Sequence, residues 1–208
     1  VSPISKSQLL ENYEISPDSI SEVYHTLRDD FLNSNGHEPS IDCIFIGRLV
    51  PQKGLQELLD FFSDKSDKTL TIIGDGKLEN LVETYANRYD NITFKGQISN
   101  GDELRTILQK HRYLVLNSIK TEKWEELFGI VIIESMSQGV VPISSNHSGP
   151  KSIITNEIGY LYDEGQLKKS LNEILNQPID EHKSKNALKA SKFYSVENIS
   201  QFWAPIEN

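Results

Sequence analysis

The sequence contains little that would suit a secreted or a membrane-spanning protein. Cys43 is the only cysteine among 208 residues, so no disulfide can form within the chain, which suits a reducing cytosol. No apolar run approaches the roughly 18 residues that a membrane-spanning helix needs, and no signal peptide is visible. We therefore expect a cytoplasmic protein that makes no direct contact with a membrane.

Basic stripes, metal-ligand spacings and dinucleotide fingerprints are also absent. The net charge is −9, which makes nucleic acid and anionic lipid poor partners for this chain. His111 and His147 lack the spacing of metal ligands, and we expect both in loops. No G-x-G-x-x-G motif follows the first predicted strand, which argues against an NAD-binding Rossmann domain.

The residues that are present are typical of one α/β domain. Hydrophobic residues make up 37% of the chain and charged residues 25%, as in soluble globular proteins. A length of 208 residues is enough for one well-buried core. The chain begins at Val1 and its only methionine is Met136, so we expect a fragment or a processed chain.

Short apolar runs alternate along the chain with longer segments of helical periodicity. This alternation predicts an α/β fold, a Rossmann-like parallel sheet flanked by helices. Strands are predicted over 42–47, 69–73, 91–95, 112–116 and 140–144, with a short edge strand over 160–162. Helices are predicted over 54–62, 78–85, 104–108 and 126–139, and through most of 166–203.

The segment from Glu126 to Gly139 is the most informative part of the sequence. Glu126 and Glu134 bracket an apolar run, and Phe128-Gly129 lies just inside the first acid. Buried carboxylates are costly unless they are hydrogen-bonded. An ionised carboxylate only accepts hydrogen bonds, so a polyhydroxylated ligand such as a sugar or a ribose would suit both acids. The alternative is an amphipathic helix with one acid at its N-terminus and the other on its solvated face.

Two glycine-containing loops follow the first two predicted strands. Residues 47–54 (GRLVPQKG) combine a glycine, two cations and a helix start, which suits a diphosphate, although a solvated loop with two surface cations would look the same. Gly74-Asp75-Gly76 either lets a ligand approach the backbone or forms a tight turn. In open parallel sheets ligands bind beyond the carboxyl ends of the strands. These loops and the Glu126 segment are therefore expected at one edge.

Taken in order, the motifs strongly resemble the C-terminal half of a family 4 glycosyltransferase of the GT-B architecture. The resemblance covers roughly residues 2–203. The motifs that carry it are G-R-L-x-x-x-K-G over 47–54, G-x-G over 74–76, F-K-G over 94–96, Asn117-Ser118, E-x-F-G-x-x-x-x-E-S-M-x-x-G over 126–139, and V-P-I-S over 141–144.

This half of such enzymes binds the nucleotide-sugar donor, and the resemblance implies a role for each matching residue. Arg48 and Lys53 would neutralise the diphosphate and stabilise charge on the leaving nucleotide. Glu126 would hold hydroxyls of the donor sugar close to the reacting carbon, so it is counted with Arg48 and Lys53 as catalytic. Glu134 would accept hydrogen bonds from the ribose.

Backbone groups complete the donor site that the resemblance implies. The N–H groups of Phe128, Gly129 and Ile130 would meet phosphate or sugar at a helix start. The base would lie near the turn Gly96-Gln97-Ile98. The remaining residues expected at the donor are Gly47, Gly74 and Ser118.

The resemblance also implies the reaction class. It is transfer of a hexosyl or N-acetylhexosaminyl unit with retention of anomeric configuration, from a UDP-sugar, with GDP- and ADP-sugars as alternatives. No metal site and no cofactor are expected, and no D-x-D metal-diphosphate signature is present. The acceptor would be a glycan or glycolipid in bacterial polysaccharide, lipopolysaccharide O-antigen or capsule synthesis. The parent enzyme would lie at the inner face of the membrane.

The resemblance divides the chain into a lead-in and interdomain linker over 1–40, a Rossmann-like core over 41–177, and C-terminal helices over 178–208. All belong to one donor-binding domain, and the last helix would cross towards an N-terminal domain that this sequence lacks. We therefore expect the chain to transfer little or nothing alone. Phe202 and Trp203 would be exposed or packed elsewhere.

Several positions depart from the family pattern. The segment 121–125 is longer than usual, and Glu125 beside Glu126 leaves a register slip possible. The family often has a glycine pair followed by an acid where this chain has Ser148-Gly149-Pro150-Lys151. His25 also stands where the family has another residue, and we expect it to have an interdomain structural role and not a catalytic one. Two other classes stay open, namely the donor-binding subunit of a two-chain transferase and a nucleotide-sugar epimerase of the same architecture.

Overall fold

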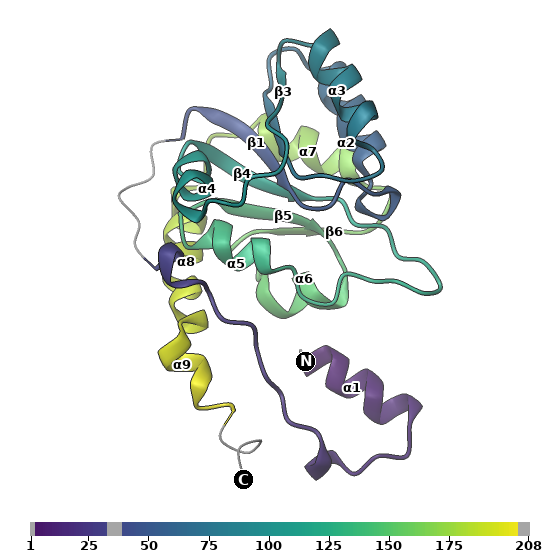
Figure 1. The fold of residues 1–208 in the computed structure, drawn as a ribbon, viewed down its shortest axis with the longest axis vertical. Helices are drawn as coiled ribbons and strands as arrows, with labels where there is room; N and C mark the ends of the chain where they lie inside the picture. Colours follow the sequence, from purple (N-terminus) through teal and green to yellow (C-terminus); the bar gives the residue numbers. More distant parts are fainter. Residues whose placement is uncertain (1–2, 33–38, 204–208) are drawn as a thin grey trace.

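The computed structural model describes residues 3–32 and 39–203 and confirms the predicted parallel sheet. Six strands, all paired in parallel, lie in the order β3-β2-β1-β4-β5-β6 (Figure 1). The order reverses between β1 and β4, which is where open sheets of this kind bind ligands. The strands are β1 (Ile41–Ile46), β2 (Leu70–Ile73), β3 (Ile92–Phe94), β4 (His111–Leu116), β5 (Val141–Ser145) and β6 (Tyr160–Tyr162).

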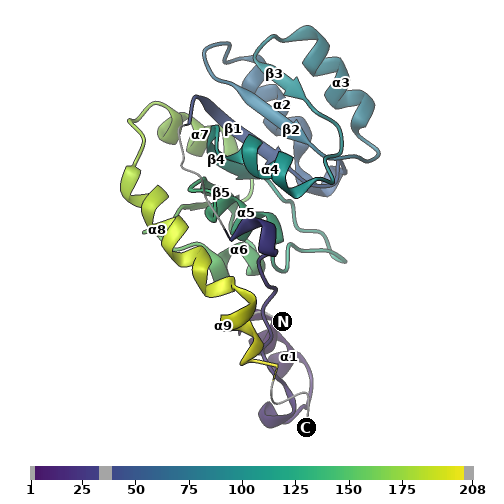
Figure 2. The ribbon, with the colours of Figure 1, turned by 60° about the vertical axis from the view of Figure 1, so that its left-hand side comes forward.

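Helices cover both faces of the sheet because alternate strand residues point to opposite sides. In β1, Cys43 and Phe45 are buried in one apolar cluster and Ile44 is buried in the other. The first cluster also contains residues of α2 (Leu55–Ser63), α3 (Glu79–Arg88) and α7 (Leu167–Leu175). The second contains residues of α4 (Gly101–Leu108), α5 (Ile130–Met136), α6 (Ser148–Ile153), α8 (Glu181–Ser191) and α9 (Val196–Ser200). In Figure 2, α8 runs along the side of the sheet that carries α5.

The predicted helix over 126–139 is wrong in its first part. Only Ile130–Met136 is helical, and residues 126–129 form a loop. Gly129 has φ 86°, a left-handed conformation that glycine adopts readily, so the helix starts after it. Gly139, also left-handed, lies in the turn that follows the helix, as the prediction of a stop there requires.

Some elements were not predicted. Within the described residues, they are α1 (Pro3–Asn12), α6 and three single turns of 3-10 helix, over Pro17–Ser19, Asp29–Phe31 and Pro51–Lys53. His111 was expected in a loop, which is wrong. It is the first residue of β4, and its ring nitrogens lie 2.7 Å from the Ile107 carbonyl and 2.8 Å from Thr71 Oγ1. Predictions for 1–2, 33–38 and 204–208 lie outside the described residues.

The lead-in returns to the body of the protein along the C-terminal segment (Figure 1). The Leu27 N–H donates to the Tyr194 carbonyl at 2.6 Å. The Tyr24 ring lies edge-on to Phe193 and to Phe202, with centroids 5.6 and 5.5 Å apart. Phe202 is therefore packed on the lead-in, whereas Trp203 is 45% exposed. Both residues were expected to be exposed or packed elsewhere, and each of these two outcomes is seen for one of them. In the described part of the chain, no helix is long and apolar enough to cross a membrane.

Candidate functional site

The loops that leave the carboxyl ends of the strands are hydrogen-bonded to one another. The Leu49 N–H donates to the Asp75 carbonyl at 2.6 Å, which joins the loops after β1 and β2. The Gly74 N–H donates to the Gly96 carbonyl at 2.9 Å, which joins the loops after β2 and β3. The glycine-containing loops are thus brought together at one edge, as the parallel topology predicted.

Gly54 and Asn117 link the loop after β1 to the loop after β4. Gly54 has φ 60°, and a Cβ there would overlap the Asn117 backbone oxygen. The Asn117 side chain donates to the Gly54 carbonyl and to Glu57, both at 3.1 Å, and accepts from Tyr162 at 2.9 Å. This contact fixes the backbone directly after Lys53. Asn117 belongs to one of the motifs that carry the resemblance, but its sequence position carries no signal of these partners.

Lys53 and Glu126 form an ion pair at this edge. Both side chains are only 13% exposed. Ser118 Oγ donates to the same carboxylate oxygen, Oε2, at 3.1 Å. The Lys53 ammonium also lies 5.3 Å from the centroid of the Trp124 ring. Three sequence-predicted residues from two loops, the loop after β1 and the loop between β4 and α5, therefore meet at one carboxylate.

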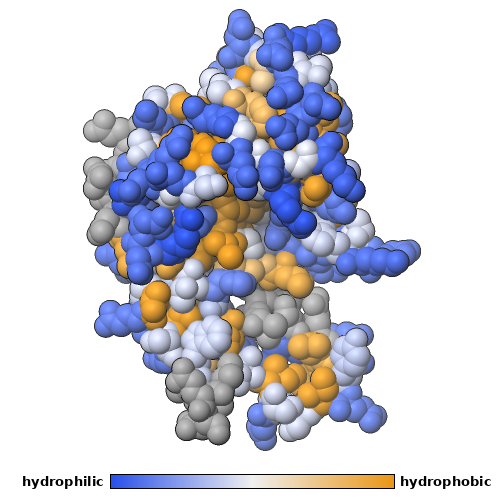
Figure 3. All heavy atoms as spheres, in the orientation of Figure 1, coloured by the Kyte–Doolittle hydropathy of each residue, from blue (hydrophilic) through white to orange (hydrophobic). Residues whose placement is uncertain are grey.

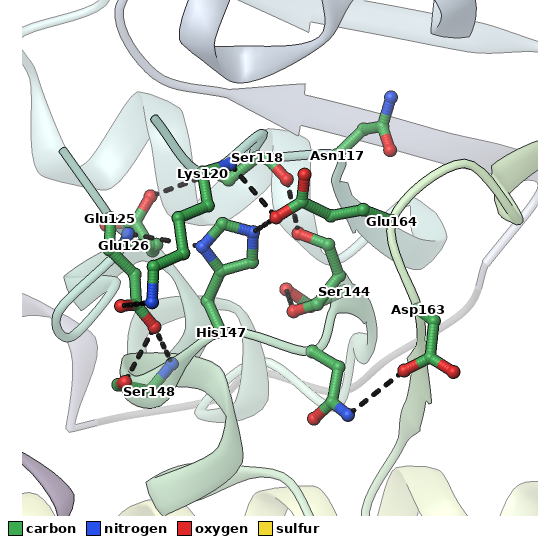
Figure 4. Close-up of polar contacts among 12 residues, drawn as sticks. Asn117, Ser118, Lys120, Glu125, Glu126, Ser144, His147, Ser148, Asp163 and Glu164 are labelled. Atoms are coloured by element: carbon green, nitrogen blue, oxygen red, sulfur yellow. Dashed lines mark hydrogen bonds and ion pairs between the residues drawn. The ribbon is translucent and has the colours of Figure 1, made fainter. Parts of the chain in front are cut away.

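The backbone of Glu126 is held by the turn that begins α6 (Figure 4). The Glu126 N–H donates to His147 Nδ1 at 3.4 Å, and the Glu126 carbonyl accepts from the Gly149 N–H at 2.9 Å. A side chain on Gly149 would overlap the backbone of Leu127 and Phe128. The glycine therefore permits the close approach that holds the Glu126 loop against α6.

Glu125 points away from Glu126 and towards the start of α6 (Figure 4). Its Oε1 accepts from the Ser148 N–H at 2.8 Å and from Ser148 Oγ at 2.6 Å, and its Oε2 lies 2.7 Å from Lys120 Nζ. Partial burial alone would raise the pKa of Glu125, but the hydrogen bonds from Lys120 and Ser148 lower it to about 2. Glu125 caps a helix, and Glu126 is the acid that faces Lys53.

His147 is buried at the centre of this polar group. Its Nε2 lies 3.0 Å from Glu164 Oε1, and the same carboxylate oxygen accepts from the Lys120 N–H at 3.0 Å. The ring is in the turn between β5 and α6, as expected of a loop residue, but its 3% exposure was not expected. Glu164 precedes α7, so the group ties three loops together.

Glu134 lies on α5 with its side chain 11% exposed, and its partner is Arg28. The Arg28 Nε is 3.2 Å from Glu134 Oε1. Burial raises the pKa of Glu134, the Arg28 charge lowers it and Asp30 raises it, with a net rise. Sequence reasoning missed Arg28 because the lead-in shows no motif or periodicity that points to α5.

Arg48 is exposed and lines a hollow of about 430 Å³. The other lining residues are Val50, Pro51, Gln52, Lys77 and Trp124. The sequence alone assigns no role to Lys77 or to Trp124. Gln52 accepts from the Ile119 N–H at 2.8 Å through its carbonyl, so the hollow is bounded by the same linked loops.

The residues expected to act through their backbone lie in exposed or half-buried turns. Gln97 is exposed, while Ile98 packs against the second apolar cluster. The Phe128 ring lies 4.6 Å from the His25 ring, which places His25 beside the loop before α5. Ile130, 42% exposed, begins α5.

In Figure 3 apolar side chains gather near the middle of the face, around α5, and hydrophilic side chains cover most of the upper part.

Among the described residues, no three or more histidine, cysteine, aspartate and glutamate side chains are grouped so that they could hold a metal ion. The polar side chains at this edge can instead neutralise an anion through Arg48 and Lys53, and accept hydrogen bonds from hydroxyls through Glu126 and Glu134.

Comparison with known proteins gives the family. The model of the family described as glycosyl transferases group 1 matches residues 28–191. An uncharacterized glycosyltransferase of Methanocaldococcus jannaschii is 28% identical over 204 residues, which cover 95% of this chain and 55% of that protein.

Solved structures share the fold. TarM of S. aureus, in a complex with fondaparinux, alpha-GlcNAc-glycerol and UDP, has a TM-score of 0.82 at 18% identity over 100% of this chain and 43% of its own. HepE of Anabaena, in a complex with UDP and glucose, has a TM-score of 0.78 at 18% identity over 99% of this chain and 61% of its own. The chain thus spans about half the length of the proteins it matches.

Proposed function

Because the chain belongs to the glycosyl transferases group 1 family, we propose that it is the donor-binding domain of a family 4 glycosyltransferase. The enzyme would retain anomeric configuration, need no metal ion and use a UDP-sugar. The observation that carries this proposal is the Lys53–Glu126 pair at the switch point of the sheet, with Ser118 on the same carboxylate. A cation and an acceptor-only group side by side suit a ligand with both a diphosphate and hydroxyls.

In the proposed complex, Arg48 and Lys53 bind the diphosphate. Arg48 offers a planar fork of donors from the exposed edge of the hollow, and Lys53 offers a compact charge. As the bond to the sugar breaks, negative charge develops on the leaving nucleotide, and these two cations stabilise it. They perform the electrostatic role that a metal ion has in other transferases.

A diphosphate that takes Lys53 as its partner leaves Glu126 without its counter-charge. The carboxylate then accepts hydrogen bonds from hydroxyls of the donor sugar, while Ser118 keeps it oriented. We propose that Glu126 contacts the sugar and does not form a covalent bond with it. The incoming acceptor would attack from the face that the leaving diphosphate occupies, which gives retention.

The nucleotide would lie along α5 and the turn after β3. Glu134 accepts hydrogen bonds from the ribose, and the base rests on the turn Gly96-Gln97-Ile98. The first N–H groups of a helix have no partner within the helix, so those at Phe128, Gly129 and Ile130 are donors for phosphate or sugar.

The acceptor site is proposed to lie mostly outside this chain, in a second domain or a separate subunit. The matched archaeal relative is longer, since the chain spans 55% of it. One neighbour of the same fold is a lipopolysaccharide outer core galactosyltransferase, WaaB, with a TM-score of 0.73 at 22% identity. We propose a glycan or glycolipid acceptor in polysaccharide or lipopolysaccharide synthesis, and transfer of a hexosyl or N-acetylhexosaminyl unit.

Calorimetric titration of the chain with UDP, GDP and ADP tests the donor class. The proposal expects binding of UDP in preference to GDP and ADP. It also expects the same UDP affinity with and without a chelator such as EDTA. Failure to bind any of the three nucleotides would contradict the donor-binding role, and loss of UDP binding on chelation would contradict independence from a metal.

A further inference from the structure

Glu134 is a buried acid whose hydrogen-bonding capacity is only partly used. Its side chain is 11% exposed, and its Oε1 lies 3.2 Å from the Arg28 Nε. Within residues 3–32 and 39–203, the Oε2 oxygen has no hydrogen-bond donor. Burying a carboxylate without full compensation is costly. This acid is therefore held by one cation and keeps one oxygen open.

Arg28 comes from the lead-in and is fixed from several sides. Its guanidinium lies 4.8 Å from the centroid of the Phe31 ring, and its Nε is also 3.5 Å from Asp30 Oδ1. Asp30 is in turn anchored, because its carbonyl accepts from Arg105 at 2.8 Å. The Arg28 side chain is 45% exposed, and its Nε faces the two acids.

We infer that Arg28 is a positioning residue of the proposed nucleotide site, which keeps Glu134 ionised and leaves its second carboxylate oxygen open to the ribose hydroxyls. This inference rests on the proposed function. It assigns a role to a lead-in residue that has no direct contact with the reacting atoms.

The electrostatic surroundings of Glu134 support this role. Burial raises its pKa, the Arg28 charge opposes that rise, and the Asp30 charge adds to it. Arg28 and Asp30 are the charged groups of the described chain that act on it. Loss of the cation raises the pKa further, so the carboxylate takes up a proton at a higher pH. Loss of the Asp30 charge has the opposite effect.

The test is calorimetric titration of UDP into wild type, Arg28→Met, Arg28→Lys and Asp30→Asn from about pH 5 to about pH 8. Methionine keeps an unbranched apolar stem over Phe31 and removes the charge. In Arg28→Met we expect UDP affinity to fall about tenfold for each unit by which the pKa of Glu134 exceeds the pH of the assay. The loss of affinity in that variant should therefore begin at a higher pH than in wild type.

The other two variants separate charge from shape. Arg28→Lys retains a cation, so it should recover part of the affinity and of the wild-type pH profile. Asp30→Asn should hold its affinity to a lower pH than wild type. A purely structural role for Arg28 would lower the thermal midpoint without moving the pH profile, so thermal unfolding is recorded for every variant.

The outcomes distinguish this inference from the proposed function. If wild type does not bind UDP, or if Glu134→Ala binds it as tightly as wild type, the proposed nucleotide site is wrong. If wild type binds UDP and Glu134→Ala binds it more weakly, but Arg28→Met keeps the wild-type affinity and pH profile, the role of Arg28 is wrong. Tighter UDP binding by Arg28→Met would also overturn the inference, because Arg28 would then be blocking Glu134.

Discussion

Lys53 and Glu126 form an ion pair between residues 73 positions apart in the sequence, at the point where the strand order of the sheet reverses. The pair joins the loop after β1 to the loop before α5. In it, the cation proposed for the diphosphate and the acid proposed for the sugar neutralise each other. Binding of a diphosphate to Lys53 should therefore change what Glu126 can accept.

The first prediction separates the sugar from the nucleotide. Glu126→Ala should leave UDP affinity unchanged or raised, because Lys53 loses an internal competitor. The same variant should bind a UDP-sugar about tenfold more weakly relative to UDP than wild type does, since hydrogen bonds to a charged group are worth about 1.5–3 kcal/mol. Calorimetric titration with both ligands measures this ratio.

Glu122→Ala is the matched control for that experiment, because Glu122 is exposed on the same loop. It should leave both affinities as in wild type. An equal loss of UDP and UDP-sugar affinity in Glu126→Ala would show that Glu126 supports the nucleotide and not the sugar.

A second prediction concerns the close contact between α6 and the Glu126 loop. Gly149→Ala places a Cβ against the backbone of Leu127 and Phe128, so it should lower the free energy of unfolding by about 2 kcal/mol. Chemical denaturation measures this loss. Gly165→Ala is the control, because its Cβ meets no atom within 4 Å although its φ of 79° is strained. A smaller loss in Gly149→Ala than in Gly165→Ala would contradict the close packing.

The third prediction is the pH dependence of the helix cap at Glu125. Its pKa is lowered to about 2 from 4.5, so the stability that it contributes is present above about pH 4.5 and lost as the pH falls towards 2. Glu125→Gln should therefore be less stable than wild type at neutral pH, by about 1 kcal/mol for a partly exposed pair. The difference in free energy of unfolding between wild type and Glu125→Gln should become smaller below about pH 4.

Urea denaturation of both proteins across this pH range measures the third prediction. Glu83→Gln, on the exposed side of α3, should show no comparable difference. If the difference in free energy of unfolding between wild type and Glu125→Gln stayed constant with pH, this would contradict the assignment of the capping charge to Glu125.

A fourth prediction concerns Asn117, whose side chain is nearly inaccessible to solvent. Asn117→Ala leaves the Gly54 carbonyl without that donor, and leaves the Tyr162 hydroxyl with only the longer hydrogen bond to the Leu116 carbonyl, at 3.3 Å. The free energy of unfolding should fall by about 2–3 kcal/mol, because buried polar groups lose their partners. UDP affinity should fall too, since Gly54 follows Lys53 directly. Ser145→Ala is a control that removes a single buried hydrogen bond, to the Ser118 carbonyl. A loss in Asn117→Ala no larger than in this control would contradict the account.

The sheet and the edge that carries the site could be predicted from the sequence for a simple reason. Buried parallel strands read as short apolar runs, and their carboxyl ends must meet at one edge. The motif spacing assigns the site role to Glu126 and not to Glu125. The direction in which the Glu125 side chain points could not be predicted. It depends on α6, whose first residues, Ser148 and Gly149, capture one acid through its side chain and the next through its backbone.

The partner of Glu134 could not be predicted either. Arg28 lies in a lead-in without periodicity, and the Leu27 backbone beside it is bonded to Tyr194, near the other end of the chain. The predicted helix over 126–139 began too early in the sequence for a related reason. The apolar run continues through Leu127 and Phe128, while the left-handed turn at Gly129 delays the helix start.

The most direct test of the donor site is the UDP affinity of Glu134→Ala, measured by calorimetric titration beside wild type and Glu173→Ala. Glu173 is an exposed acid on α7, on the opposite face of the sheet, so its removal changes the net charge equally. The account predicts that Glu134→Ala binds UDP at least about tenfold more weakly than the other two proteins, given the strength of hydrogen bonds to a carboxylate. Equal affinity in all three would contradict it.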